Sequence, residues 1–77
     1  MKVLCVADIN VSNEIYKKVL KAGVEVEWGT AENVQEAKAV EEFYDHVVVS
    51  GIKYHSKKCI SVEKLISSKI TNETIYL

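Results

Sequence analysis

The chain contains no arginine, and its ten Lys+Arg residues are all lysines. Without a guanidinium group there is no arginine finger, no bidentate clamp on a phosphate and no cysteine-phosphatase loop closed by arginine. Lysine still offers a point charge to a phosphate. The missing arginines therefore argue against phosphoryl-transfer enzymes and leave simpler anion contacts open.

Proline is also absent, and no apolar run approaches the roughly 18 residues of a membrane span. The apolar run after Lys2 ends at Asp8 with no small-residue cleavage site behind it, so no secretory signal is expected. We therefore expect a cytoplasmic protein whose two cysteines, Cys5 and Cys59, are reduced thiols. The lysine-rich, arginine-free composition favours an AT-rich source, such as a phage or a low-GC bacterium.

What is present is typical of one small globular domain spanning residues 1–77, with 48% hydrophobic and 27% charged residues. The net charge of −1 hides an uneven distribution. Residues 1–22 carry a net +2, residues 23–45 a net −6 and residues 46–77 a net +3. A surface polarised in this way can steer a charged partner.

The hydropathy pattern predicts alternating strands and helices. Continuous apolar runs at 2–7 and 47–49 are typical of strands buried on both faces. Residues 24–28 alternate apolar and acidic side chains, which predicts an edge strand with one wet face, and a last short strand is expected at 73–77. Helical spacing of apolar residues predicts helices over 11–22, 34–44 and 62–66.

Small polar residues and glycines mark the expected ends of these elements. Asn10 and Ser12 are both good N-caps for the first helix, and Gly23 is a natural stop for it. Gly29 and Thr30 are interpreted as a turn, with Thr30 capping the second helix.

Strands that alternate with helices indicate parallel β-α-β units with right-handed crossovers. The expected fold is a three-layer α/β/α sandwich with a four-stranded parallel sheet in the order 2-1-3-4. This order buries the two most apolar strands and places the alternating strand at an edge. Because both sheet edges stay open, we expect a homodimer or a partner-bound protein.

Ligands of open parallel sheets bind beyond the carboxyl ends of the strands, near the point where the strand order reverses. Polar residues follow the first and third predicted strands at that edge. The expected ligand-binding residues are Asp8, Asn10, Ser50, Gly51 and Lys53.

Three segments together resemble the first half of a response-regulator receiver domain, a flavodoxin-like fold. They are residues 2–8 (KVLCVAD), 21–26 (KAGVEV) and 44–50 (YDHVVVS), and the likeness covers roughly the first 52 residues. The resemblance implies a parallel α/β sandwich with its site at the carboxyl edge of the sheet.

The chain departs from the receiver pattern where that family carries its chemistry. The family has an acidic pair where this chain has Ala7 and Asp8, and Ser50 stands where the phosphoacceptor aspartate would be. The last strand, with its lysine, has no counterpart. The resemblance therefore implies a shortened, degenerate relative without aspartyl-phosphate chemistry. A second likeness, to enzyme IIB domains of sugar phosphotransferase systems, is poorer because Cys5 lies inside the strand.

Individual reactive residues have structural alternatives. We interpret Asp8 as a helix cap rather than a Mg²⁺ ligand, and Cys5 as an inert core thiol rather than a nucleophile. His55 and Cys59 are spaced as a helical ligand pair, but no further zinc motif is present, so no metal and no cofactor are expected. Trp28 is equally suited to covering the core and to anchoring a partner.

The leading hypothesis is a small non-enzymatic regulatory or protein-interaction domain. Its expected partner contacts are Trp28, Tyr54, His55, Lys57 and Lys58. One alternative is a phosphate- or nucleotide-binding module with weak enzymatic activity, built on the ligand-binding residues at the sheet edge. Another is a nucleic-acid-binding protein that uses the basic segment 53–58, although the isoelectric point of about 6.1 is low for that role.

Overall fold

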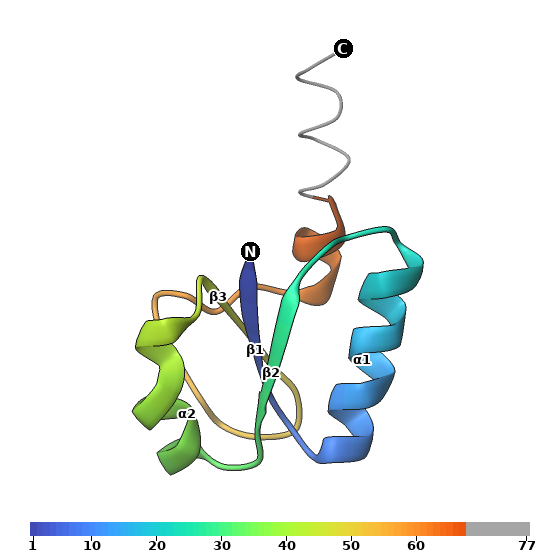
Figure 1. Cartoon of the computed structure of the whole chain (residues 1–77). Coiled ribbons are helices and arrows are strands. Elements are labelled where there is room, and N and C mark those ends of the chain that lie inside the picture. The colour runs from blue at the N-terminus through green and yellow to red at the C-terminus, as the bar shows by residue number, and fades with distance from the viewer. Residues whose placement is uncertain (68–77) are drawn as a thin grey trace.

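The computed structural model describes residues 1–67, which fold into a parallel β-sheet with helices on both faces (Figure 1). The elements in chain order are β1 (Lys2–Val6), α1 (Ile9–Lys21), β2 (Glu27–Ala31), α2 (Val34–Val40), the 3-10 turn η1 (Glu41–Phe43), β3 (His46–Val49) and a helix over 62–67. None of the helices in this range is long and apolar enough to cross a membrane.

The sheet has three parallel strands in the order β2-β1-β3. Beyond β3, the Val47 N–H donates to the Lys58 carbonyl at 2.9 Å and the Ile60 N–H donates to the Val47 carbonyl at 2.8 Å. Residues 58–60 thus add one parallel bridge at the β3 edge. The parallel α/β architecture and the order of the first three strands are confirmed, whereas the fourth predicted strand, 73–77, lies outside the described residues.

Each face of the sheet has its own core. Alternate side chains of a strand point to opposite faces, so β1 contributes Leu4 and Val6 to one core and Val3 to the other. The first core packs under α2 and η1, and the second packs under α1 and the helix 62–67 (Figure 1). The buried residues of the second core are Val3, Val19, Val24, Val48 and Leu65.

The second strand does not lie where the alternating pattern predicts it. The prediction of a strand at 24–28 with a turn at Gly29 and Thr30 was wrong, because β2 begins at Glu27 and contains both turn residues. Val24 is used instead to close α1: Gly23 adopts φ +82°, and the Val24 N–H donates to the Val19 carbonyl at 3.3 Å. The apolar residue expected to begin a strand therefore belongs to the end of a helix.

The helix caps also differ from the expected ones. Asp8 caps α1, since its Oδ1 accepts the Asn10 N–H at 2.9 Å, while Ser12 is buried one turn into the helix. Asn33, not Thr30, caps α2: its Oδ1 accepts the Glu36 N–H at 2.9 Å, and Glu36 Oε1 accepts back from Asn33 Nδ2 at 3.1 Å. The first bond satisfies a backbone donor that a free helix end leaves open, and the second holds the two side chains together. The interpretation of Asp8 as a cap is confirmed.

Candidate functional site

The carboxyl edge of the sheet holds the predicted ligand-binding residues, whose polar groups either take part in the fold or face solvent. One carboxylate oxygen of Asp8 accepts the hydrogen bond that caps α1. The Ser50 N–H donates to the Val6 carbonyl at 3.1 Å and continues the sheet. Gly51 turns the chain at φ +73°, and a Cβ placed there would meet open space. Asn10 and Lys53 are exposed. Apart from the Asp8–Asn10 cap, no hydrogen bond within residues 1–67 joins members of this set.

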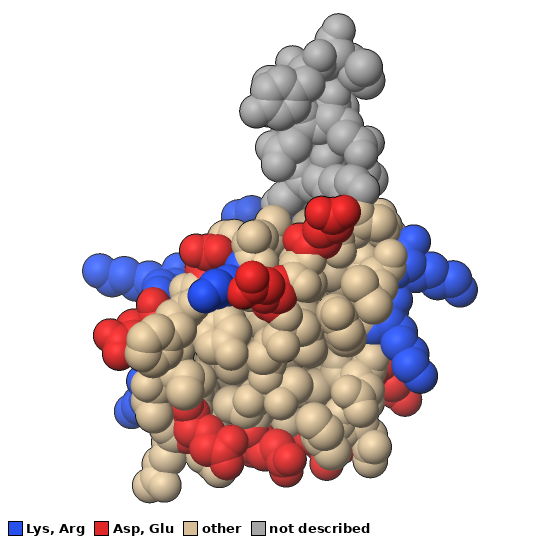
Figure 2. All heavy atoms as spheres, viewed as in Figure 1, with Lys and Arg blue, Asp and Glu red and all other residues tan. Residues whose placement is uncertain are grey.

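The charges at this edge disfavour an anion. Asp8 follows β1, and Glu32 and Glu36 follow β2, so three carboxylates flank the loops that a phosphate would need. Figure 2 shows acidic side chains along the lower rim of the molecule, where the strands end. Lys53 is the one cation in the predicted set. Within the described part of the chain, no group of three His, Cys, Asp or Glu residues is arranged to hold a metal ion.

The basic segment 53–58 runs from the carboxyl edge back along β3 and is fastened to η1 by two of its residues. Tyr54 is buried in the core under α2, and its hydroxyl donates to Glu41 Oε1 at 2.7 Å. Lys58 Nζ donates to the Tyr44 carbonyl at 2.8 Å and to the Glu41 carbonyl at 3.2 Å. A cation at these carbonyls satisfies the end of the 3-10 turn. The structure thus gives these two predicted partner contacts a role inside the fold.

His55 and Lys57, the other predicted contacts of this segment, are exposed, as is Lys53. Cys59, four residues after His55, lies in the bridge beside β3 rather than on a helix. The segment therefore exposes two lysines and His55 to solvent, and the Tyr54 ring is turned inward. A stacking platform for bases would need exposed rings.

The contact between Tyr54 and Glu41 makes the attachment of this segment dependent on pH. The hydroxyls of Ser56 and Tyr54 hold the pKa of Glu41 below its ordinary 4.5. Burial, with Glu41 beside it, raises the pKa of Tyr54 from 10.0 to about 12. A lowered acid pKa adds stability that is present above pH 4.5 and is lost as the pH falls through the folded-state value. A raised tyrosine pKa adds stability below pH 10 that is lost as the pH rises to about 12.

We expect Tyr54→Phe to lower the free energy of unfolding at pH 7 by about 1 kcal/mol, because Glu41 loses the hydroxyl of Tyr54 that donates to it. The difference between variant and wild type should shrink as the pH falls below 4.5, where Glu41 of the wild type also loses its charge. Urea unfolding at several pH values measures this. A deficit that stays constant down to pH 2 would mean that the hydroxyl acts through packing and not through the Glu41 carboxylate.

The two cysteines differ in access. Cys5 is fully buried in β1, and burial raises the pKa of its thiol despite the nearby Ser12 hydroxyl. Cys59 is exposed, with its Sγ 3.8 Å from Ser56 Oγ. Both thiols are free. The interpretation of Cys5 as a core residue agrees with this placement.

We expect Cys59 to react with a thiol reagent at the rate of an exposed cysteine and Cys5 to react about a hundredfold more slowly, because Cys5 reacts only after the strand opens. A stopped-flow assay with Ellman's reagent on wild type and on Cys59→Ser separates the two phases. In urea both thiols should react at one rate. Equal rates in the native protein would contradict the burial of β1.

The expected open sheet edge lies at β2, and the structure adds which of its backbone groups face outward. In a parallel pair, alternate residues point their backbone groups toward the neighbouring strand. The Glu27 N–H donates to the Met1 carbonyl at 2.9 Å, and the Ala31 carbonyl accepts the Ala7 N–H at 3.0 Å, so the odd-numbered residues of β2 face β1. The N–H and C=O groups of Trp28 and Thr30 therefore point away from the sheet, and none of the described residues pairs with them.

Aromatic side chains flank this edge on both faces of the sheet. On the α1 face, the rings of Trp28 and Tyr16 stack with centroids 5.1 Å apart. On the other face, Tyr44 lies directly over Gly29, where its Cε1 would be 2.8 Å from a Cβ. Gly29 therefore makes room for the Tyr44 ring beside the strand. The Trp28 ring packs against the core, so its side chain covers the interior while its backbone faces outward.

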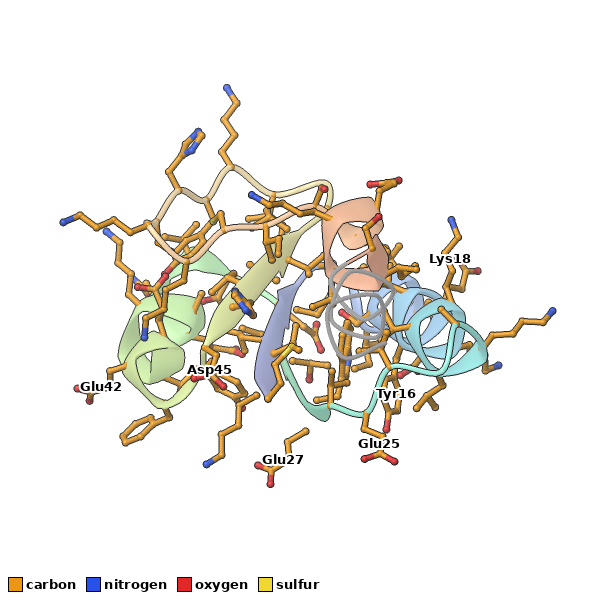
Figure 3. The ribbon with its side chains drawn as sticks, turned by 90° about the horizontal axis from the view of Figure 1, so that it is seen from above. Tyr16, Lys18, Glu25, Glu27, Glu42 and Asp45 are labelled. Atoms are coloured by element: carbon orange, nitrogen blue, oxygen red, sulfur yellow. The ribbon has the colours of Figure 1, made fainter. Side chains whose placement is uncertain are left out.

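Carboxylates surround the same edge. Figure 2 looks onto the β2 side and shows an uncharged expanse with acidic side chains above and below it. Seen from the amino ends of the strands, Glu25 and Glu27 lie beside β2, and Asp45 and Glu42 continue the row toward η1 (Figure 3). Lys2 Nζ lies 3.7 Å from Glu27 Oε2 in an exposed pair, and the Lys2 N–H donates to Asp45 Oδ2 at 2.9 Å. The Lys2 ammonium thus pairs with Glu27, and the N-terminal amine adds a second positive charge near these carboxylates.

Comparison with protein-family models, with curated proteins and with solved structures found no match. The resemblance to receiver domains accordingly stays a prediction from the sequence.

Proposed function

We propose that the chain is a small, non-enzymatic protein-interaction domain of the cytoplasm, acting in regulation, and that it binds its partner through the open edge of β2. The observation that carries this proposal is the outward direction of the backbone groups of Trp28 and Thr30. Natural sheets generally block or cover such an edge, because it is a template for a further strand. An extended peptide that adds to a sheet edge gains main-chain hydrogen bonds, and its alternate side chains contact the flanking surface.

The other groups of the molecule support binding rather than catalysis. Cys5 is buried, Asp8 caps a helix, and the carboxyl edge carries three carboxylates without a metal cluster among residues 1–67. The Tyr54 hydroxyl does donate to the Glu41 carboxylate, but Tyr54 is buried and this bond fastens the segment 53–58 to η1. Open backbone groups flanked by aromatic rings are instead typical of a surface that receives another chain.

The proposal is tested by comparing three immobilised baits: wild type, Thr30→Pro and Lys57→Ala. Proline at position 30 removes an outward N–H and puts a ring on the edge, while the bonds between β1 and β2 stay intact. A host protein that binds wild type and Lys57→Ala but not Thr30→Pro supports the proposal. Binding that survives Thr30→Pro and is lost in Lys57→Ala would assign the partner surface to the segment 53–58 instead.

A further inference from the structure

We infer that the partner of the β2 edge is a basic, extended peptide segment that adds to the sheet as a fourth strand beside β2. This inference rests on the proposed function and names the chemistry of the partner. It follows from the charges at the two ends of the open strand and from the rings that flank it.

Both ends of β2 present carboxylates. Glu25 and Glu27 stand at its amino end, and the Glu27 side chain is 76% exposed. Glu32 follows its carboxyl end, where its backbone N–H donates to Glu36 Oε2 at 3.4 Å. A strand lying along Trp28 and Thr30 therefore has acidic side chains near both of its ends. Lysine or arginine at these positions of the partner is attracted, and aspartate or glutamate is repelled.

The middle of the edge is apolar and aromatic. Because side chains alternate between the faces of a sheet, a partner strand lays one row of side chains beside Trp28 and Tyr16 and the other row beside Gly29 and Tyr44. The flat rings accept either an aliphatic side chain or the stem and charge of a lysine, which is favoured over an aromatic face. A peptide that alternates basic and β-branched residues suits both the rings and the carboxylates.

A second copy of the chain suits the edge less well. Antiparallel pairing of two β2 strands about Gly29 sets Glu27 opposite Ala31 of the second copy and next to its Glu32. The same contact recurs on the other side of the two-fold axis, so acidic side chains gather at both ends of the pair. These carboxylates are not directly opposite one another, but gathering like charges at both ends of the paired edge opposes association of two copies. The charges thus favour a basic partner over the homodimer that the open edges alone suggest.

The inference is tested with a fluorescein-labelled synthetic peptide in which lysine alternates with valine, followed by anisotropy against the full chain. The matched control peptide carries glutamate in place of each lysine. We expect the lysine peptide to bind and the glutamate peptide not to bind. Added salt should weaken binding, since the carboxylates concerned are exposed.

Variants separate backbone pairing from unspecific attraction. Thr30→Pro should weaken binding about tenfold or more, because one main-chain hydrogen bond and the close approach of the peptide are lost. The double variant Glu25→Gln with Glu27→Gln should weaken binding about fivefold, as expected for two exposed ion pairs. Glu63→Gln, an exposed carboxylate on the helix 62–67, is the matched control and should leave affinity unchanged. Replacing the Thr30 amide with an ester by chemical ligation removes only the N–H. This ester variant takes the place of Thr30→Pro in the binding assay if the proline variant does not fold.

Each other outcome overturns the inference in a recognisable way. Equal binding of the lysine peptide to wild type and to both Thr30 variants would show that it is held by charge alone, away from the edge. Stronger, Thr30-dependent binding of the glutamate peptide would keep the edge as the binding surface and reject a basic partner. Self-association in sedimentation that Thr30→Pro abolishes would make a second copy the occupant. If neither peptide binds while a host protein still binds wild type but not Thr30→Pro, the inference fails and the proposed function stands. If no host protein binds in that manner either, both fail.

Discussion

Proline at position 31 is expected to lower the free energy of unfolding by about 3 kcal/mol, whereas proline at position 30 leaves the chain folded. The Ala31 N–H faces β1, so Ala31→Pro leaves a buried carbonyl of that strand without its donor. The proline ring also enters a site where Ala31 is 1% exposed, which overpacks the core. For a domain of 77 residues such a loss is a large part of the total stability.

The contrast between the two neighbouring prolines is what the direction of the β2 backbone predicts. The Thr30 N–H makes no bond to β1, and proline is tolerated on edge strands where the lost N–H faces solvent. Urea denaturation of both variants, followed by circular dichroism, measures the difference. If Thr30→Pro unfolds the chain and Ala31→Pro does not, β2 is paired through the opposite set of residues, and the open edge lies elsewhere.

Leu65→Ala is expected to cost about 2–5 kcal/mol, the range for removing a large aliphatic side chain from a core. Leu65 is fully buried, and it packs with Val3, Val19 and Val48 on the α1 face of the sheet. The helix 62–67 therefore closes the second core beside α1. Without Leu65 a cavity remains under the helix, and the strand side chains below it are opened to water.

The matched control for Leu65→Ala is Glu63→Ala on the same helix. Glu63 is exposed, so its substitution should change stability by less than about 0.5 kcal/mol. Thermal or urea unfolding of the two variants measures the difference in their free energies of unfolding. Equal and small effects would mean that the helix does not dock on the sheet and that α1 alone covers this face.

Much of the fold follows from hydropathy because the central strands are unambiguous. The runs around Leu4 and Val47 are apolar on both faces, and α1 has one apolar side, so the parallel order with β2 at the edge can be deduced. The position of β2 could not, because Val24 serves the end of α1 and Gly29 mimics a turn residue. Gly29 is small because Tyr44, which is distant in sequence, lies on it.

The candidate site was less predictable, because it depends on contacts between distant segments. The segment 53–58 looks like a solvated basic patch, yet Tyr54 and Lys58 reach back to η1. A hydrogen bond over 13 residues leaves no periodic pattern in the sequence. The open edge itself was expected, but its outward backbone groups could not be assigned: they depend on the register of β2, and an error of one residue exchanges the two sets. The acidic alternation of Glu25 and Glu27 was the one visible signal.

Amide hydrogen exchange, resolved by residue with NMR, tests the central claim most directly. In the free protein the Gly29 and Ala31 amides should exchange slowly because they bond to β1, and the Trp28 and Thr30 amides should exchange fast because they face outward. On saturation with the lysine–valine peptide, Trp28 and Thr30 should become protected. Amides of Trp28 and Thr30 that stay unprotected while the peptide is bound would contradict the assignment of the β2 edge as the binding surface.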